Sequence, residues 1–313
     1  MTQTTPGELE PTLSSEHAAA IENNLFPAAR GIVRDQIHFP WHRDELNRPT
    51  AALINSSQAL AIDVLWTIRS LPSRDRIIDS WCDHLGLPHR GPWEIQLEHV
   101  VDRGLLGESR CTQLDAIATS PDGLLIIECK FTESDGGSCS QWKPITGRSP
   151  NAGSVQCNGN YEPQVNPVNG KTAKCALTAK GIRYWEVVPS VLRIAADSFY
   201  QPCPFKGGWY QWMRNLVTAS AMGEAAGLPA AFVVAYADGP FPMAQKIAEA
   251  DTESQSDWAR LTGMTAGRSV PLRTCSYQQL LDIAKDVADV EDSKTILDLE
   301  SWLSAKVCRA SLL

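Results

Sequence analysis

The clearest alternation of hydrophobic and polar positions in this chain lies in residues 113–133. In its first half, odd-numbered positions such as Asp115 and even-numbered positions such as Leu114 fall on opposite sides, which is the period of a β-strand. Residues 120–123 are Ser-Pro-Asp-Gly, which favours a turn because proline fixes φ and glycine tolerates a positive φ. Residues 124–131 then form an apolar run that is interrupted at two positions. The pattern therefore predicts a β-hairpin whose second strand is largely buried.

The two polar positions of that second strand are Glu128 and Lys130, which point to the same face because they are two residues apart. Asp115, on the other strand, can reach the same place across the hairpin. Ionisable groups beside an apolar sheet cost free energy unless they are compensated, and two close carboxylates usually share a proton or bind a divalent cation. The lysine adds compensation and a donor for an anionic substrate. The alternative is an exposed Glu/Lys pair on an edge strand.

The arrangement Asp-x12-Glu-x-Lys on two strands of one hairpin resembles the active site of the PD-(D/E)XK, or restriction-endonuclease-like, nucleases. The resemblance implies that Asp115 and Glu128 bind Mg²⁺ or Mn²⁺. It implies that Lys130 orients or deprotonates the water that attacks a phosphodiester. Glu98, on the preceding predicted strand, is the candidate for a third acid and metal ligand. Leu114 stands where the family often has proline, which is a departure from its pattern.

The order of the predicted elements is similar to the core of that superfamily. A helix, three strands, an insertion, a second helix and an inner strand are expected in residues 55–70, 93–101, 113–120, 124–131, 134–205, 209–226 and 230–236. We therefore expect an α/β protein with the restriction-endonuclease-like αβββαβ core. Such a protein has a central mixed sheet and flanking helices, and here it also carries a cysteine-containing insertion.

At 313 residues the chain is long enough for one elaborated domain or two small ones. We predict three parts, an N-terminal tail with a helix, a nuclease core and a C-terminal helical and edge-strand extension: residues 1–54, 55–240 and 241–313. The N-terminal helix is expected to begin at Ser15. The extension is expected to contain an edge strand near residues 270–272, a helix capped by Ser276 and a last helix over about residues 292–306.

Polar side chains on the helix over residues 209–226 are further candidates for the site. Gln211, Arg214 and Asn215 share one face of this helix because they are three and four positions apart. In the RecB-like branch of the superfamily, a helix after the lysine carries a glutamine and a further polar residue. The resemblance implies that Gln211 and Arg214 line the site or contact DNA, although the match is loose because a long insertion precedes the helix.

The N-terminal part of the chain offers fewer candidates. Gln58, at the start of the helix over residues 55–70, is a second source of polar contacts to the site or to DNA. Asp63 is the only acid inside that helix, and we do not assign it to the site. His38 and His42 are four residues apart and could form a metal pair. Two neighbouring prolines favour an irregular loop instead, so these histidines are also left out.

The insertion contains four of the nine cysteines of the chain: Cys139, Cys157, Cys175 and Cys203. Structural zinc or an iron–sulfur cluster held by these four residues is one alternative. Their long spacings lack a Cys-x-x-Cys pair, and scattered reduced thiols are the favoured interpretation. Residues 139–203 also carry seven Lys/Arg and three Asp/Glu, interleaved with aromatic residues. This composition suits contact with a phosphate backbone, and Lys171 and Lys174 are the candidates for it.

The whole-chain composition limits the class of protein. No apolar run approaches the length of a membrane span, and the N-terminus lacks a signal-peptide pattern, so we expect a cytoplasmic protein without a membrane partner. The net charge of −8 argues against bulk attraction to nucleic acid but not against a local basic groove. We predict a Mg²⁺-dependent DNA endonuclease, by analogy one that serves restriction or defence. A non-cleaving nucleic-acid-binding module, a metal-dependent RNase and a homodimer stay open as alternatives.

Overall fold

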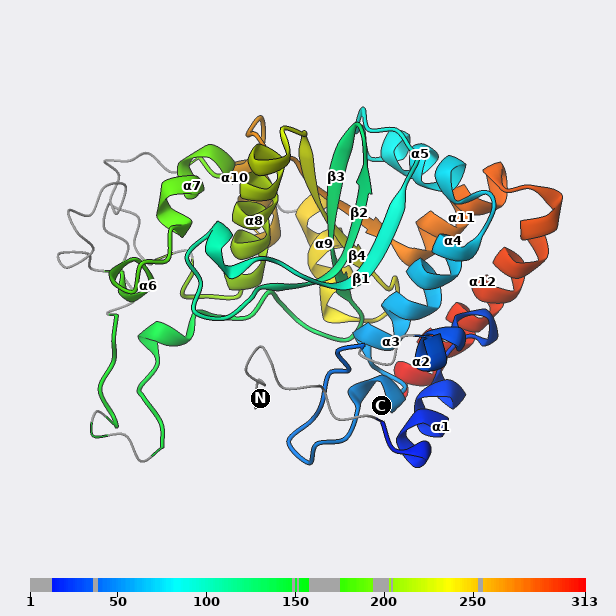
Figure 1. The fold of residues 1–313 in the computed structure, drawn as a ribbon, viewed down its shortest axis with the longest axis horizontal. Helices are drawn as coiled ribbons and strands as arrows, with labels where there is room; N and C mark the ends of the chain where they lie inside the picture. The colour runs from blue at the N-terminus through cyan, green and yellow to red at the C-terminus, as the bar shows by residue number, and fades with distance from the viewer. Residues whose placement is uncertain are drawn as a thin grey trace.

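A mixed five-stranded sheet lies at the centre of the protein, with helices on both of its faces (Figure 1). The computed structural model describes residues 13–35, 39–147, 150, 152–157, 175–193, 203, 205–252 and 256–313. The strands follow one another across the sheet in chain order: β1 (Glu94–Val100), β2 (Gln113–Ser120), β3 (Gly123–Lys130), β4 (Ala230–Tyr236) and β5 (Leu272–Ser276). The prediction of an α/β protein with a central mixed sheet and flanking helices is confirmed.

Strands β2 and β3 form the predicted hairpin. Ser120 pairs with Gly123 across a two-residue turn, and Ala116 pairs with Ile127 near the other end of the hairpin. β1 runs antiparallel to β2, whereas β4 runs parallel to β3 and β5 parallel to β4. The edge strand expected near residues 270–272 is β5, which begins two positions later than the sequence pattern indicated.

The alternation within β3 divides its side chains between two apolar cores. Every residue of β3 is buried, as its apolar sequence predicts. The odd-numbered side chains from Leu125 to Phe131 belong to the core on one face of the sheet, whereas Leu124 and Ile126 belong to the core on the other. Glu128 and Lys130 are the next even-numbered positions of β3, so their side chains point to the same face as Leu124 and Ile126. This is the face that helix α8 (Tyr210–Ala226) covers.

The first face of the sheet is covered by helices from both ends of the chain (Figure 1). They are α1 (Ser15–Asn24), α2 (Gly31–Asp35), α3 (Ser57–Ala61), α4 (Thr67–Ser70), α5 (Arg74–His84), α11 (Tyr277–Val287) and α12 (Val290–Ala310). The predicted start of the first helix at Ser15 and the capping box at Ser276 and Gln279 are confirmed. α12 includes the predicted last helix but is longer at both ends.

The second face is covered by α7 (Tyr184–Val191), α8, α9 (Pro242–Thr252) and α10 (Asp257–Thr265). In Figure 1, α7 and α8 lie on the opposite side of the sheet from α5 and α11. The sequence patterns did not predict α5, α7, α9 or α10. The insertion over residues 134–205 contains α7 and the short helix α6 (Ala176–Ala179). The predicted division into three parts stays a prediction.

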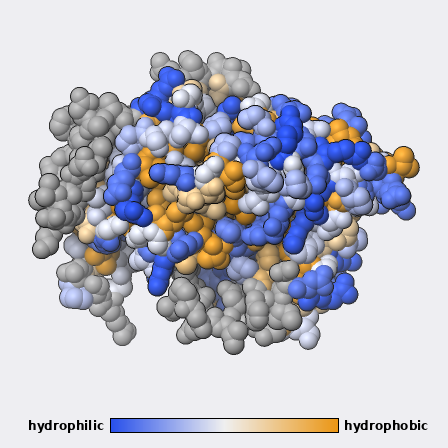
Figure 2. All heavy atoms as spheres, turned by 45° about the horizontal axis from the view of Figure 1, so that its top comes forward, coloured by the Kyte–Doolittle hydropathy of each residue, from blue (hydrophilic) through white to orange (hydrophobic). Residues whose placement is uncertain are grey.

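Hydrophilic side chains cover much of the surface. Figure 2 shows one face, on which apolar atoms gather near the middle among hydrophilic side chains. Each helix of the described residues is too short or too polar to span a bilayer.

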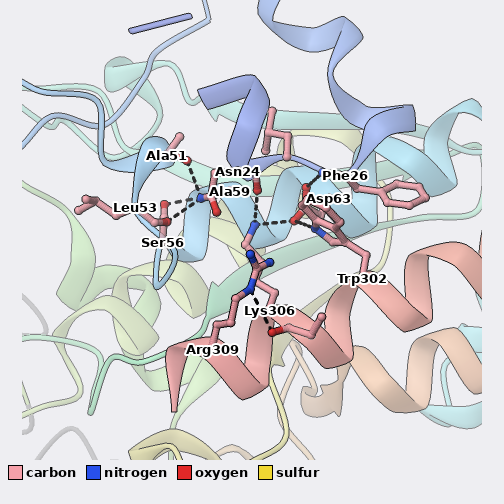
Figure 3. A network of polar contacts seen from close by, with 12 residues as sticks. Asn24, Phe26, Ala51, Leu53, Ser56, Ala59, Asp63, Trp302, Lys306 and Arg309 are labelled. Carbon is pink, nitrogen blue, oxygen red and sulfur yellow. Dashed lines mark hydrogen bonds and ion pairs between the residues drawn. The ribbon is translucent and has the colours of Figure 1, made fainter. Parts of the chain in front are cut away.

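A buried ion pair joins the two ends of the chain to the centre of the first face (Figure 3). The helix predicted over residues 55–70 is present, but its middle is a π-helical segment, η3 (Ile62–Trp66), which carries Asp63. Lys306 Nζ lies 2.6 Å from Asp63 Oδ2 and donates to the carbonyl of Asn24 at 2.8 Å. Trp302 Nε1 also donates to Asp63 Oδ2, and the amide of Phe26 donates to Oδ1.

This ion pair explains why Asp63 takes no part in the polar site of the hairpin. Burial raises the pKa of Asp63 and lowers that of Lys306, because each charge loses its hydration, while their pairing opposes both shifts. The pair thus holds α1, η3 and α12 in one arrangement. Each of the two groups favours the charged form of the other.

Replacing Lys306 by methionine should lower the free energy of unfolding by about 3–5 kcal/mol, because Asp63 is left buried without its cation. Urea unfolding followed by circular dichroism measures the change. The double variant Asp63→Leu/Lys306→Met should be more stable than the single variant, because neither charge then lacks a partner. A single variant within about 0.5 kcal/mol of the wild type would contradict this account.

Candidate active site

Three carboxylates occupy one row across strands β1, β2 and β3. The register pairs Ala116 with Ile127, which makes Asp115 and Glu128 the next opposed positions of the hairpin. On the other side of β2, Glu98 is the residue of β1 opposite Asp115. The three acids predicted from the sequence therefore lie next to one another at one end of the antiparallel part of the sheet.

Glu98 is held in an unusual backbone conformation. Its φ is +52°, in the left-handed region, which costs a residue other than glycine about 1–3 kcal/mol and needs support from its surroundings. Gln58 donates to one carboxylate oxygen at 2.6 Å and Gln113 to the other at 2.7 Å. The simple alternation expected for this strand therefore ends at Glu98, whose side chain is 4% exposed. Gln58 reaches the site through this contact.

His42 completes the surroundings of Glu98. Its Nε2 lies 3.2 Å from Glu98 Oε2, and its backbone amide donates to Gln58 Oε1 at 3.0 Å. Burial lowers the pKa of His42, but the hydrogen bond to Glu98 and the charges of Glu98, Asp115 and Glu128 outweigh it and raise the pKa to about 9. His42 is thus an imidazolium at neutral pH. The sequence analysis left this residue out, and no local pattern links it to Glu98.

Helix α8 supplies the partners of Glu128 and Lys130. Lys130 Nζ lies 2.8 Å from Glu128 Oε1 and donates to Gln211 Oε1 at 3.2 Å. Asn215, one turn later on the helix, donates to Glu128 Oε2 at 2.6 Å. The ring of Trp212 lies 5.2 Å from the same ammonium, measured to its centroid. The structure therefore places Gln211 and Asn215 of this helix against the two polar side chains of β3.

Lys130 keeps its charge at this buried position. Burial lowers the pKa of Lys130, but Glu128, Asp115 and Glu133 together raise it above the ordinary value for lysine. An ammonium with a raised pKa holds its proton at neutral pH. Lys130 can therefore donate hydrogen bonds and neutralise negative charge, but it is a poor base.

Asp115 is the one member of the row whose charge is poorly compensated. Burial raises its pKa well above the ordinary value, and the charges of Glu128 and Glu98 raise it further. Lys130 and a 2.7 Å hydrogen bond from the amide of Cys129 to Oδ2 oppose the shift without cancelling it. Asp115 lies deep among protein atoms but keeps part of its surface accessible. A cation at this place would oppose the shift, because it would stabilise the charged form of the carboxylate.

The donor set suits a divalent cation bound by two carboxylates. Oxygen ligands are those that Mg²⁺ prefers, and Mg²⁺ commonly takes one or two carboxylates and fills its other positions with water and substrate phosphate. No three His, Cys, Asp or Glu side chains among the described residues are arranged to hold a metal ion. Asp115 and Glu128, which oppose each other on the hairpin, would hold the ion, although both oxygens of Glu128, like both oxygens of Glu98, also face protein donors.

Other predicted residues lie away from this row or outside the described residues. Arg214 shares the expected helix face with Gln211, yet its guanidinium carbon lies 5.8 Å from the ring centroid of Tyr210, a contact separate from the carboxylates. Lys171 and Lys174 lie outside the described residues, as does His38.

The four cysteines of the insertion lie in segments that are held near one another: Cys139, Cys157, Cys175 and Cys203. The amide of Cys139 donates to the carbonyl of Phe205 at 2.9 Å, next to the segment of Cys203. Burial raises the pKa of Cys139 to about 11 and that of Cys203 to about 12, and neighbouring cysteines add to both shifts. These shifts favour the neutral thiol form of Cys139 and Cys203. A structural metal stays a prediction that elemental analysis can test.

Replacing Asp115 by asparagine should stabilise the metal-free protein at neutral and alkaline pH. The pKa of Asp115 is raised by folding, so the unfolded state gains stability as the pH rises above the ordinary carboxyl value of about 4. Urea unfolding in EDTA should give Asp115→Asn a higher midpoint than the wild type at about pH 8, with a smaller difference at about pH 4. Asp122→Asn, at the exposed turn, is the control. A lower midpoint for Asp115→Asn at the higher pH would refute this account.

One comparison with known proteins gives a match to this chain. The family model described as Restriction Endonuclease associating with ARP matches residues 12–302, a range that includes the sheet, the carboxylate row and the helices on both faces. Neither the curated proteins nor the solved structures contain a match to this chain. The chain belongs to the family Restriction Endonuclease associating with ARP.

Proposed function

We propose that this protein is a Mg²⁺-dependent endonuclease that hydrolyses phosphodiester bonds of DNA. The observation that carries the proposal is the row of opposed carboxylates beside a charged lysine, in which burial and the neighbouring acids raise the pKa of Asp115. The family supports a nuclease-like or defence role. On this proposal, the helix α3–α4, strands β1–β3, helix α8 and strand β4 form the αβββαβ core of restriction-endonuclease-like nucleases.

Asp115 and Glu128 would hold the metal ion. When bound, Mg²⁺ lowers the pKa of a bound water and offsets charge that develops on the phosphate. Lys130 would orient the attacking water or donate to a phosphate oxygen, because its ammonium holds its proton. Gln211 and Glu128 fix the direction of that ammonium, and Asn215 fixes Glu128 in turn. Such preorganised donors stabilise the transition state without reorganisation during the reaction.

The cluster around Glu98 would act on the substrate through His42. Glu98, supported by Gln58 and Gln113, directs the imidazolium of His42 beside the carboxylate row. The side chain of His42 is 46% exposed, so it can meet a phosphate group from solution. A second positive group on this side would place the phosphate between His42 and Lys130. Glu98 would then be a positioning residue rather than a metal ligand.

A DNA substrate is favoured because the family is one of restriction endonucleases, but the same site could cleave RNA. A non-cleaving nucleic-acid-binding module is the alternative of another class. The intact set of Asp115, Glu128 and Lys130, with each polar group supported, favours cleavage over binding alone. Incubation of the purified protein with plasmid DNA, linear DNA and RNA, each with Mg²⁺ or with EDTA, distinguishes these functions. Cleavage that EDTA abolishes is the expected result.

Replacing Lys130 by methionine should lower the cleavage rate by about 10²–10³, the range for loss of one preorganised donor at a transition state. Circular dichroism should show that the variant is folded. The matched control is Lys285→Met, which removes a lysine that pairs with Asp282 and Glu300 on the surface. Cleavage at the wild-type rate by Lys130→Met would exclude this lysine from the reaction.

A further inference from the structure

A small cavity is lined in part by Trp212, whose ring also contacts Lys130. Its volume is about 100 Å³, and it is lined by side chains of the segment after β3 and of α8, α9 and α10: Asp135, Gly208, Trp209, Trp212, Met243, Lys246, Asp257 and Trp258. Trp212 contributes to both places, since its ring also lies 5.2 Å from Lys130 Nζ. A group in the cavity would thus contact a side chain that also contacts the lysine.

Backbone hydrogen bonds join the two segments that line the cavity, the one after β3 and the one at the start of α8. The amide of Gly136 donates to the carbonyl of Gly208 at 2.7 Å, and the amide of Gln211 donates to the carbonyl of Gly136 at 2.6 Å. Close approach needs glycine here, because a Cβ on Gly136 would lie 2.5 Å from Trp212 Nε1 and a Cβ on Gly208 would lie 2.8 Å from the Cβ of Asp135. The cavity and the Gln211–Lys130 contact therefore share one rigid support.

The lining combines aromatic surface with charged groups. Trp212 and Trp258 meet edge to face, with ring centroids 5.5 Å apart, and Trp209 forms a third aromatic wall. Asp135 and Asp257 offer carboxylate acceptors, and Lys246 offers a donor. A packing defect within a core is typically lined by apolar side chains and stays dry. This lining instead suits a flat ligand that has both a π face and polar edges.

We propose that this cavity binds one unpaired nucleobase of the nucleic-acid substrate, next to the phosphate that is cleaved. The inference rests on the proposed nuclease function and adds a substrate class to it. Bases taken out of a duplex are held by aromatic stacking and by hydrogen bonds to their polar edges. Carboxylate acceptors favour a base with an exocyclic amino group, such as cytosine, over thymine. The preferred substrate would therefore have an unpaired base near the cut.

Binding of mononucleotides tests this inference separately from cleavage. Quenching of tryptophan fluorescence should show that dCMP binds more tightly than deoxyribose 5-phosphate, which has the same phosphate and sugar but no base. It should also show that dCMP binds more tightly than dTMP. Measurements in EDTA remove any contribution of cleavage. If dCMP and deoxyribose 5-phosphate bind equally, the cavity does not take a base, whether or not the protein cleaves DNA.

Variants locate the binding. Trp258→Leu should weaken dCMP binding roughly tenfold or more, as expected for the loss of one base–aromatic contact, and should leave binding of deoxyribose 5-phosphate unchanged. Trp66→Leu, on the opposite face of the sheet, is the matched control. Asp257→Asn, whose side chain is 74% exposed and can be replaced without disturbing the core, should reduce the preference for dCMP over dTMP. Unchanged dCMP binding and unchanged preference in these two variants would overturn the proposal.

Discussion

The repulsion among three adjacent carboxylates is the constraint on which the site depends. Glu98, Asp115 and Glu128 occupy one row of a sheet that is covered on both faces, where charges are poorly solvated. Each outer acid has its own supporting groups, Glu98 from the N-terminal segments and Glu128 from Lys130 and α8. Asp115, in the middle, receives one backbone hydrogen bond and shares the charge of Lys130. The elements around the sheet thus compensate two acids and leave the third, Asp115, with a raised pKa.

The buried ion pair between Asp63 and Lys306, on the first face of the sheet, helps to hold the groups that support Glu98. Asp63 lies in η3, which directly follows α3, and α3 carries Gln58. The contacts of Asp63 with Lys306 and Phe26 hold that helix against both ends of the chain. Gln58 in turn fixes Glu98 and the backbone of His42. The C-terminal helix α12 therefore helps to position Gln58, although none of the site residues named above belongs to α12.

The parts of the site that sequence could predict are those that depend on local geometry. The period of two placed Glu128 and Lys130 on one face, and the short turn placed Asp115 opposite Glu128. His42 could not be predicted, because its contact with Glu98 depends on the tertiary fold and on a left-handed residue that ends the alternation of β1. Spacing on α8 also could not distinguish Asn215 from its neighbours. Only the docking of the helix decides which side chain reaches β3.

Proton release on binding of Mg²⁺ tests the central claim most directly. If burial and the neighbouring carboxylates raise the pKa of Asp115, then a divalent ion that binds there must displace a proton from it. Calorimetric titrations in buffers of different ionisation enthalpy count the protons released. At a pH somewhat above the ordinary carboxyl value of about 4, the wild type should release a proton per bound ion, and Asp115→Asn should release fewer or bind no ion. Binding of Mg²⁺ without proton release, or equal release by both proteins, would contradict the account.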